Sequence, residues 1–139
     1  HALADELGLS PRIAWHGGCS HAELPALYSC AHVVAVPSVV DDTGDRDGLP
    51  NVVLEALASA RTVVATRVGA IESAISDGNT GSLVPPGDAT ALARALDTLA
   101  RNGRLARALA IRGRRLVERR YDVTACAQQF TQMLASAYA

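Results

Sequence analysis

Short apolar runs alternate with longer amphipathic segments through the first two thirds of the chain. By their length and β-branched content, the apolar runs predict strands over residues 12–16, 32–36, 62–66 and 81–84. The segments between them predict helices over residues 22–30 and 50–60, with a shorter helical turn over residues 69–75. Strands that alternate with helices are typical of an α/β fold whose parallel sheet carries helices on both faces.

The pattern changes after residue 84, where two prolines and a glycine end the last strand. From there the apolar spacing predicts three consecutive helices, the first of them capped by Asp88, over residues 88–102, 104–120 and 122–138. The last helix carries one apolar stripe, formed by Val123, Cys126, Ala127, Phe130, Met133, Leu134 and Ala137. Such a stripe predicts packing against another surface.

The composition narrows the class of protein. With 139 residues, 49% of them hydrophobic and 19% charged, the chain is expected to form a single globular domain. Residues 88–139 would be the helical end of that domain.

All of the basic side chains are arginine. Without lysine, the chain lacks the P-loop lysine and the Schiff-base lysine, so any phosphate must be bound in another way.

The net charge of −1 is distributed unevenly, because residues 101–120 contain eight arginines and a single acidic residue, Glu118. A solvated helix face is the usual meaning of such a segment, and peripheral contact with an anionic membrane surface is the alternative. We expect no nucleic-acid partner.

Other features bear on the origin of the chain. It begins at His1 and its only methionine is Met133, so we expect a fragment or a processed product. There is no signal-peptide pattern, and the apolar runs are far shorter than the roughly 18 residues of a membrane span. The odd set of Cys19, Cys30 and Cys126 favours a reducing compartment. The expected location is the cytoplasm.

Ligands of parallel α/β sheets bind in the loops that follow the carboxyl ends of the strands. Three loops have this place: residues 17–20, which contain Gly17 and Gly18, residues 37–49 and residues 67–70. We expect all three to meet at one edge of the sheet. Pro50 suits the first turn of the helix that follows, and the N–H groups and dipole of that turn form an anion site without lysine.

Glu55 is the only charged side chain in that helix. A buried carboxylate is costly unless it accepts hydrogen bonds, and the diol of a ribose would supply them. The alternative is a structural pair with Arg67 or with backbone N–H groups. Asp47 lies eight residues before Glu55, so the two carboxylates could flank one ligand, or Asp47 could be a turn residue in a solvated acidic run.

Potential metal ligands are closely spaced at His16, Cys19, His21, Cys30 and His32. In the predicted fold, His16 ends one strand and His32 begins the next, so they lie at opposite sheet edges, roughly 15 Å apart. Four ligands of one zinc ion cannot span that distance, and we expect no metal site. The motifs of dinucleotide-binding proteins, zincins and serine hydrolases do not occur.

Four segments resemble, in order, the motifs of one enzyme family. They are residues 27–38 (LYSCAHVVAVPS), 47–58 (DGLPNVVLEALA), 63–69 (VVATRVG) and 77–88 (DGNTGSLVPPGD). Together they resemble the C-terminal, donor-binding domain of the group 1 (family 4) glycosyltransferases, which are retaining enzymes of the GT-B fold with a Rossmann-like sheet. Several motifs in the family's order make this resemblance more specific than any one of them.

The resemblance implies that Glu55 binds the ribose of a nucleotide-sugar donor. It also implies that Asp47, where the family usually has Glu, is catalytic and contacts the transferred sugar. The backbone near the donor's sugar and phosphate would be that of Gly48, Leu49, Pro50 and Asn51. The loop of Gly17 and Gly18 would lie near the base. The resemblance implies neither a metal nor another cofactor.

In the family, an Arg and a Lys from an earlier loop hold the pyrophosphate, and a preceding domain binds the acceptor. Neither lies in this sequence, so the resemblance implies an N-terminally truncated domain that is inactive alone. Its last helix would cross toward the missing domain, with the apolar stripe partly exposed or open to self-association. The whole protein would transfer a hexosyl group to an unknown acceptor. The alternatives are a GT-B nucleotide-sugar epimerase and a non-catalytic α/β interaction module.

Overall fold

Three parallel strands form the centre of the structure, a computed structural model that describes residues 1–40 and 48–137. The strands are β1 (Val33–Val36), β2 (Thr62–Thr66) and β3 (Ser82–Val84). They lie in the order β1-β2-β3, with Val34 opposite Val63 and Ala65 opposite Leu83. Helices connect β1 to β2 and β2 to β3, as parallel pairing requires.

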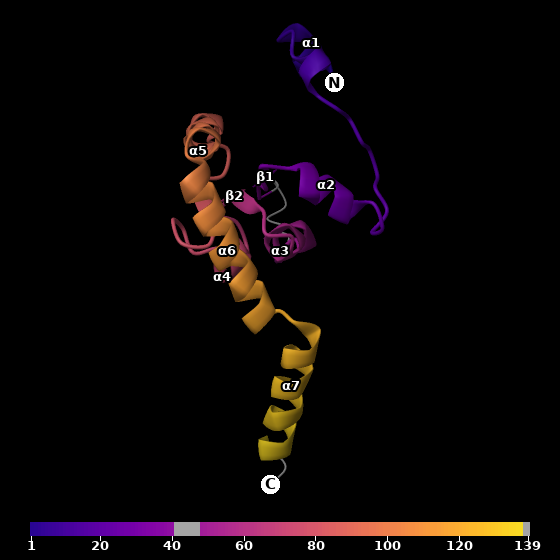
Figure 1. The fold of residues 1–139 in the computed structure, drawn as a ribbon, viewed down its shortest axis with the longest axis vertical. Coiled ribbons are helices and arrows are strands. Elements are labelled where there is room, and N and C mark those ends of the chain that lie inside the picture. Colours follow the sequence, from indigo (N-terminus) through magenta and orange to yellow (C-terminus); the bar gives the residue numbers. More distant parts are fainter. Residues whose placement is uncertain (41–47, 138–139) are drawn as a thin grey trace.

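Some helices cover this sheet, whereas the first and the last lie away from it (Figure 1). Their bounds are α1 (Ala2–Glu6), α2 (Leu24–Cys30), α3 (Asn51–Ala58), α4 (Ile71–Ala74), α5 (Ala89–Arg101), α6 (Gly103–Arg120) and α7 (Val123–Ala137). Asp88 caps α5 as predicted, because its carboxylate accepts a hydrogen bond of 2.8 Å from the Ala91 N–H. The break before α6 lies at Asn102, which ends α5 and caps α6 through the Leu105 N–H.

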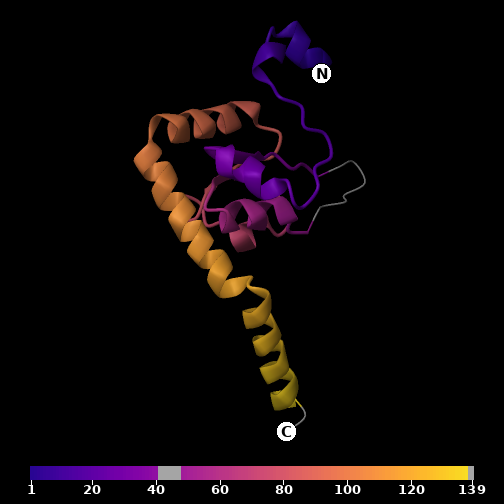
Figure 2. The same cartoon turned by 45° about the vertical axis from the view of Figure 1, so that its right-hand side comes forward.

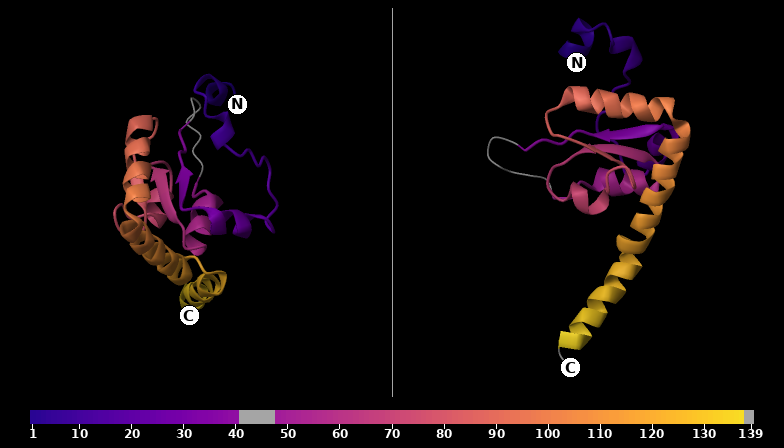
Figure 3. Two further views of the ribbon diagram at one scale, coloured as in Figure 1. Left: turned by 45° about the horizontal axis from the view of Figure 1, so that its top comes forward. Right: turned by 90° about the vertical axis from the view of Figure 1, so that its left-hand side faces the viewer.

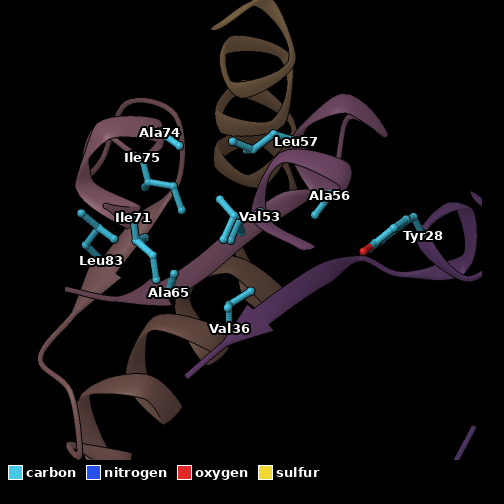
Figure 4. Packing of buried hydrophobic residues seen from close by; sticks show 11 residues of the cluster. Tyr28, Val36, Val53, Ala56, Leu57, Ala65, Ile71, Ala74, Ile75 and Leu83 are labelled. Atoms are coloured by element: carbon cyan, nitrogen blue, oxygen red, sulfur yellow. The ribbon is translucent and has the colours of Figure 1, made fainter. Parts of the chain in front are cut away.

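The strand β2 separates two hydrophobic cores. On one face, Val63 and Ala65 pack with α3 and α4, in the core drawn in Figure 4. On the other face, Val64 packs with Leu99 of α5 and Leu109 of α6. Figure 3 shows the sheet between these two layers. Every residue of β2 is buried, as expected for a strand with helices on both faces of its sheet, whereas β1 at the edge is partly exposed.

The helix α6 joins the two cores. Leu109, in its first half, belongs to one core, and Val117, further along, packs against the other. Between them lies the buried Gly113, where a Cβ would sit 2.5 Å from Leu57 Cδ2 and 2.9 Å from the Thr80 carbonyl oxygen. Glycine at this position therefore allows α6 to approach α3 closely.

The strand predicted over residues 12–16 is wrong. Ser10–Arg12 forms a 3₁₀ turn, and Ile13 leaves it in an extended conformation that pairs with none of the described strands. A strand needs a neighbour for its backbone hydrogen bonds, and this segment lies apart from the sheet (Figure 2). Ile13 and Trp15 are exposed as a consequence.

The helix α7 points away from the sheet (Figures 1 and 2). The residues of its predicted apolar stripe are exposed. Val123 is 79% exposed and Met133 is 69% exposed. No residue of α7 is buried in the described part of the chain. The predicted stripe is therefore present on the helix, but it is not packed against a core.

The arginines of residues 101–120 lie along the end of α5 and on α6. Arg101 pairs with Asp97 at 2.7 Å and Arg114 with Glu118 at 2.8 Å, both one helical turn apart. Arg112 is half-buried and donates to the Asn79 carbonyl, whereas the other arginines are exposed. No helix within the described ranges is long and apolar enough to cross a membrane.

Replacing Gly113 with alanine should lower the free energy of unfolding by about 1–2 kcal/mol. A Gly→Ala change inside a helix gains up to about 1 kcal/mol, but overpacking a filled core costs about 1–3 kcal/mol. The overpacking cost should exceed the gain in helix propensity, because Leu57 is fully buried and the Thr80 carbonyl belongs to the backbone, so neither can move away easily. Urea denaturation measures the difference.

The matched control is Gly103→Ala at the first residue of the same helix, where the added Cβ has nothing within 4 Å. This change should leave the free energy of unfolding unchanged or raise it slightly. Equal effects of the two substitutions would contradict the close contact between α3 and α6.

Candidate functional site

The carboxyl ends of β1 and β2 bring two of the predicted loops together. The Thr66 hydroxyl, at the end of β2, donates a hydrogen bond of 2.5 Å to the carbonyl of Ser38, which follows β1. The Ala70 N–H donates to the Gly48 carbonyl at 3.2 Å. The loops after these strands therefore meet at one edge of the sheet, as predicted, and α3 begins there.

The start of α3 differs slightly from the prediction. Pro50 is the N-cap, with an extended conformation (φ −60°, ψ 129°), and does not lie in the first turn. Its carbonyl accepts a hydrogen bond of 3.0 Å from the Val53 N–H. Leu49 packs against the core, whereas Gly48 and Asn51 are exposed. Leu49 thus anchors this segment, and the positive end of the α3 dipole faces the edge of the sheet.

Glu55 lies on α3 and is half-buried. Its Oε2 accepts a hydrogen bond of 2.9 Å from the Tyr28 hydroxyl. Tyr28 is only 8% exposed, and Figure 4 shows its side chain reaching from α2 toward the helix that carries Ala56. Burial, the hydrogen bond and the negative charge of Glu55 raise the pKa of Tyr28 to about 12. The hydroxyl is therefore a protonated donor at neutral pH.

The predicted alternative of a Glu55–Arg67 pair is wrong. Arg67 donates to Glu72 at 3.0 Å and to Asp77 at 2.9 Å. Asp77 also accepts a hydrogen bond of 2.9 Å from the Leu83 N–H, so these contacts hold the segment between α4 and β3. Ion pairs with this degree of exposure contribute at most about 1 kcal/mol each. Among the described residues, the hydrogen-bond partner of the Glu55 side chain is therefore the Tyr28 hydroxyl and not an arginine.

Glu55 also lines a groove of about 230 Å³. The other lining residues come from the α2 region and from the end of α3: His21, Leu24, Pro25, Tyr28, Ala58 and Ser59. A larger groove of about 710 Å³ opens at the opposite edge of the sheet, where His32 and Thr62 lie at the beginnings of β1 and β2. That groove contains none of the predicted site residues, so size alone does not locate the site.

Gly17 and Gly18 lie in the segment that leads into α2. Glu23 Oε2 accepts hydrogen bonds from the Ser20 hydroxyl at 2.6 Å and from the Ser20 N–H at 2.8 Å. The hydroxyl contact and then the N–H contact lower the pKa of Glu23. No described hydrogen bond connects this segment to the loops after β1 and β2. The predicted meeting of three loops is therefore confirmed for two of them only.

The last predicted site residue, Asp47, lies outside the described residues, and its place beside Glu55 stays a prediction. Of the described site residues, the structure brings Gly48 to the loop after β2 and places Glu55 further along α3. Tyr28 is the contact that the sequence did not single out. Tyr28 could have been noticed as the only tyrosine before residue 121, but the spacing of residues along the sequence does not identify its partner on α3.

The potential metal ligands lie in separate places. His16, Cys19 and Cys30 line a groove beside α2, whereas His21 and His32 line two others. His16 does not end a strand, so the predicted placement of His16 and His32 at opposite sheet edges is wrong. Across residues 1–40 and 48–137, no group of three or more His, Cys, Asp or Glu side chains is arranged to hold a metal ion.

This geometry agrees with comparisons to known proteins. The family model described as "Glycosyl transferases group 1" matches residues 1–102. The chain belongs to this family. D-inositol 3-phosphate glycosyltransferase of Mycobacterium tuberculosis is 40% identical over 99 residues, which make up 71% of this chain and 19% of that protein. The chain thus spans about a fifth of the length of the curated relatives that it matches.

Solved structures give the same result for the fold. Sucrose-phosphate synthase from Thermosynechococcus elongatus matches with a TM-score of 0.84 and 34% identity, over 99% of this chain and 33% of that one. Anabaena HepE in complex with UDP matches with a TM-score of 0.88 and 26% identity, over 98% and 35%. These neighbours are GT-B glycosyltransferases, so the predicted α/β fold with its helical end is confirmed.

The contact between Tyr28 and Glu55 predicts an unusual titration. In the tyrosinate absorbance of the folded chain, Tyr28 should titrate with a pKa of about 12. Glu55→Gln should lower this pKa, but not to the usual value near 10, because burial is the largest cause of the shift. The Tyr28→Phe variant identifies the part of the absorbance change that belongs to Tyr28. The Glu118→Gln variant, which removes a remote carboxylate, is the control. A wild-type pKa near 10 would contradict the burial of Tyr28, and an equal pKa in Glu55→Gln would contradict the contact.

The same shift has a consequence for stability. The pKa of Tyr28 is higher in the folded chain than in the unfolded chain. The contribution of Tyr28 to the free energy of unfolding is therefore complete below about pH 10 and is lost as pH rises toward 12. The slope of unfolding free energy against pH in this range should be smaller in Tyr28→Phe than in the wild type. Equal slopes would show that the hydroxyl is not perturbed.

Proposed function

We propose that this chain is the donor-binding domain of a retaining glycosyltransferase, which transfers a hexosyl group from a nucleotide diphosphate sugar. The observation that carries this proposal is the half-buried Glu55 carboxylate, held by Tyr28 on a helix that begins at the ligand-binding edge of the sheet. HepE was solved with UDP and with UDP-glucose, which supports a nucleotide-sugar ligand for this chain.

In this proposal, Glu55 accepts a hydrogen bond from a hydroxyl of the donor's ribose. The backbone of Gly48, Leu49, Pro50 and Asn51 faces the sugar and the phosphates, and the Gly17-Gly18 segment lies near the base. Asp47 contacts the transferred sugar and is the catalytic residue. The exposure of Gly48 and Asn51 supports this assignment, since a ligand can approach these residues without moving the core.

The pyrophosphate would be bound by N–H groups at the start of α3 and by an Arg–Lys pair from an earlier part of the whole protein. Such groups are aimed at the phosphate charge before the reaction, so they can stabilise the leaving nucleotide without a metal. The acceptor would bind to a preceding domain. The 139-residue chain would then bind nucleotide without transferring sugar.

Glu55→Gln should weaken nucleotide binding by about 1–3 kcal/mol, because a ribose hydroxyl loses a charged acceptor and polar groups are left mispaired. Calorimetric titration of the chain with UDP, GDP and ADP measures this loss. Glu118→Gln, which removes an exposed carboxylate on α6, should leave the affinity unchanged. Unchanged affinity in a folded Glu55→Gln variant would refute the ribose assignment.

Asp47→Ala should reduce the turnover of the whole protein by about a hundredfold, the usual effect of removing one electrostatic group from a transition state. Its affinity for the nucleotide alone should change little, because the contact is made to the sugar. Asp45→Ala, in the same loop, is the matched control. Equal losses for nucleotide and nucleotide-sugar binding, with normal turnover, would contradict the role.

The type of reaction is tested on the whole protein. NMR of the product should show that the anomeric configuration of the donor is retained in a new glycoside. An epimerised nucleotide-sugar as the product would instead identify an epimerase. Failure of the chain to bind any nucleotide at millimolar concentration would favour an interaction module.

A further inference from the structure

The hydroxyl of Tyr28 is fixed in position more firmly than the carboxylate that it contacts. Its ring is part of the core formed around β2, and the side chain is only 8% exposed. A tyrosine ring has two main torsions, so anchoring the ring also fixes the direction in which the hydroxyl can donate. Glu55 has a longer and more flexible side chain, which is half-buried.

The hydrogen bond of 2.9 Å from Tyr28 engages only Oε2 of Glu55. A carboxylate has two oxygens and about four acceptor positions. Within residues 1–40 and 48–137, Oε1 accepts no hydrogen bond from another side chain, so it can accept one from a ligand. Both side chains line the groove of about 230 Å³ between α2 and the end of α3. The contact thus lies at the wall of a groove, where a ligand can reach the carboxylate, and is not enclosed in the core.

We propose that Tyr28 is a positioning residue of the donor site: its hydroxyl holds Oε2 of Glu55, so that Oε1 is presented to a ribose hydroxyl of the donor. This inference rests on the proposed function. Without Tyr28, the Glu55 side chain would have to lose its rotamer freedom when the ligand binds, and that loss would reduce affinity.

A purely structural role is the competing explanation, since the contact also connects α2 to α3. The two explanations differ in what the ligand must carry. If Tyr28 acts through Glu55, its effect depends on the ribose hydroxyls of the nucleotide. If Tyr28 only supports the fold, its removal affects every nucleotide equally.

The experiment uses Tyr28→Phe, which keeps the ring in the core and removes only the hydroxyl. Binding of UDP, GDP and ADP to the wild-type chain is measured by calorimetry, and the tightest ligand is then compared with its 2′,3′-dideoxy counterpart. Tyr28→Phe should weaken binding of the ribonucleotide by about three- to tenfold, the range of one hydrogen bond. Binding of the dideoxynucleotide should change less than twofold.

Two further variants complete the design. The double variant Tyr28→Phe/Glu55→Gln should bind no more weakly than Glu55→Gln alone, because residues that act through one contact are not additive. Tyr121→Phe is the matched control, since its hydroxyl donates to the Ser73 carbonyl at 3.0 Å and not to Glu55. It should leave the affinity unchanged, and urea denaturation reports the stability of each variant.

Each failure has a separate meaning. If no ribonucleotide binds to the wild type, or if Glu55→Gln binds normally, the proposed donor site is wrong and this inference falls with it. If Glu55→Gln weakens binding but Tyr28→Phe does not, only the role of Tyr28 is overturned. Equal weakening for the ribonucleotide and the dideoxynucleotide would also overturn it, because Tyr28 would then act through the fold.

Discussion

The burial of β2 is the constraint on which the rest of the structure depends. All of its residues are removed from solvent, and its apolar side chains alternate between two cores. The polar ends of the strand remain paired, because the Thr62 hydroxyl donates to the Ala106 carbonyl at 2.6 Å and the Thr66 hydroxyl to Ser38 at 2.5 Å. One contact fixes α6 at the amino end of β2, and the other fixes the loop after β1 at its carboxyl end.

The candidate site follows from this arrangement. Leu49 belongs to the same core as β2, so the segment before α3 is held against the sheet while its backbone stays at the edge. On α3, Val53, Ala56 and Leu57 face the core and Glu55 lies beside them, partly withdrawn from water. A carboxylate in such a place requires a donor, and the Tyr28 hydroxyl supplies one.

Local sequence signals predicted much of the fold. Asp88 and the apolar spacing around it predicted α5 because a cap and a helical period act within a few residues. The strand expected over residues 12–16 was wrong for the opposite reason, since a strand exists only where a second strand accepts its hydrogen bonds. The partner of Glu55 could not be predicted either, because Arg67 and Tyr28 are both plausible donors until the helices are placed.

From residue 22 onward, the sequence by itself therefore determined the order of strands and helices. It also determined the buried character of β2, the family, and Glu55 as the polar exception in an apolar helix. These properties depend on composition, period and motif order, which are local. The tertiary structure decided which residues meet: Tyr28 with Glu55, Arg67 with Glu72 and Asp77, and Gly113 with Leu57. Those contacts join residues far apart in the chain or on different elements, so they depend on how the elements pack, which local periodicity does not encode.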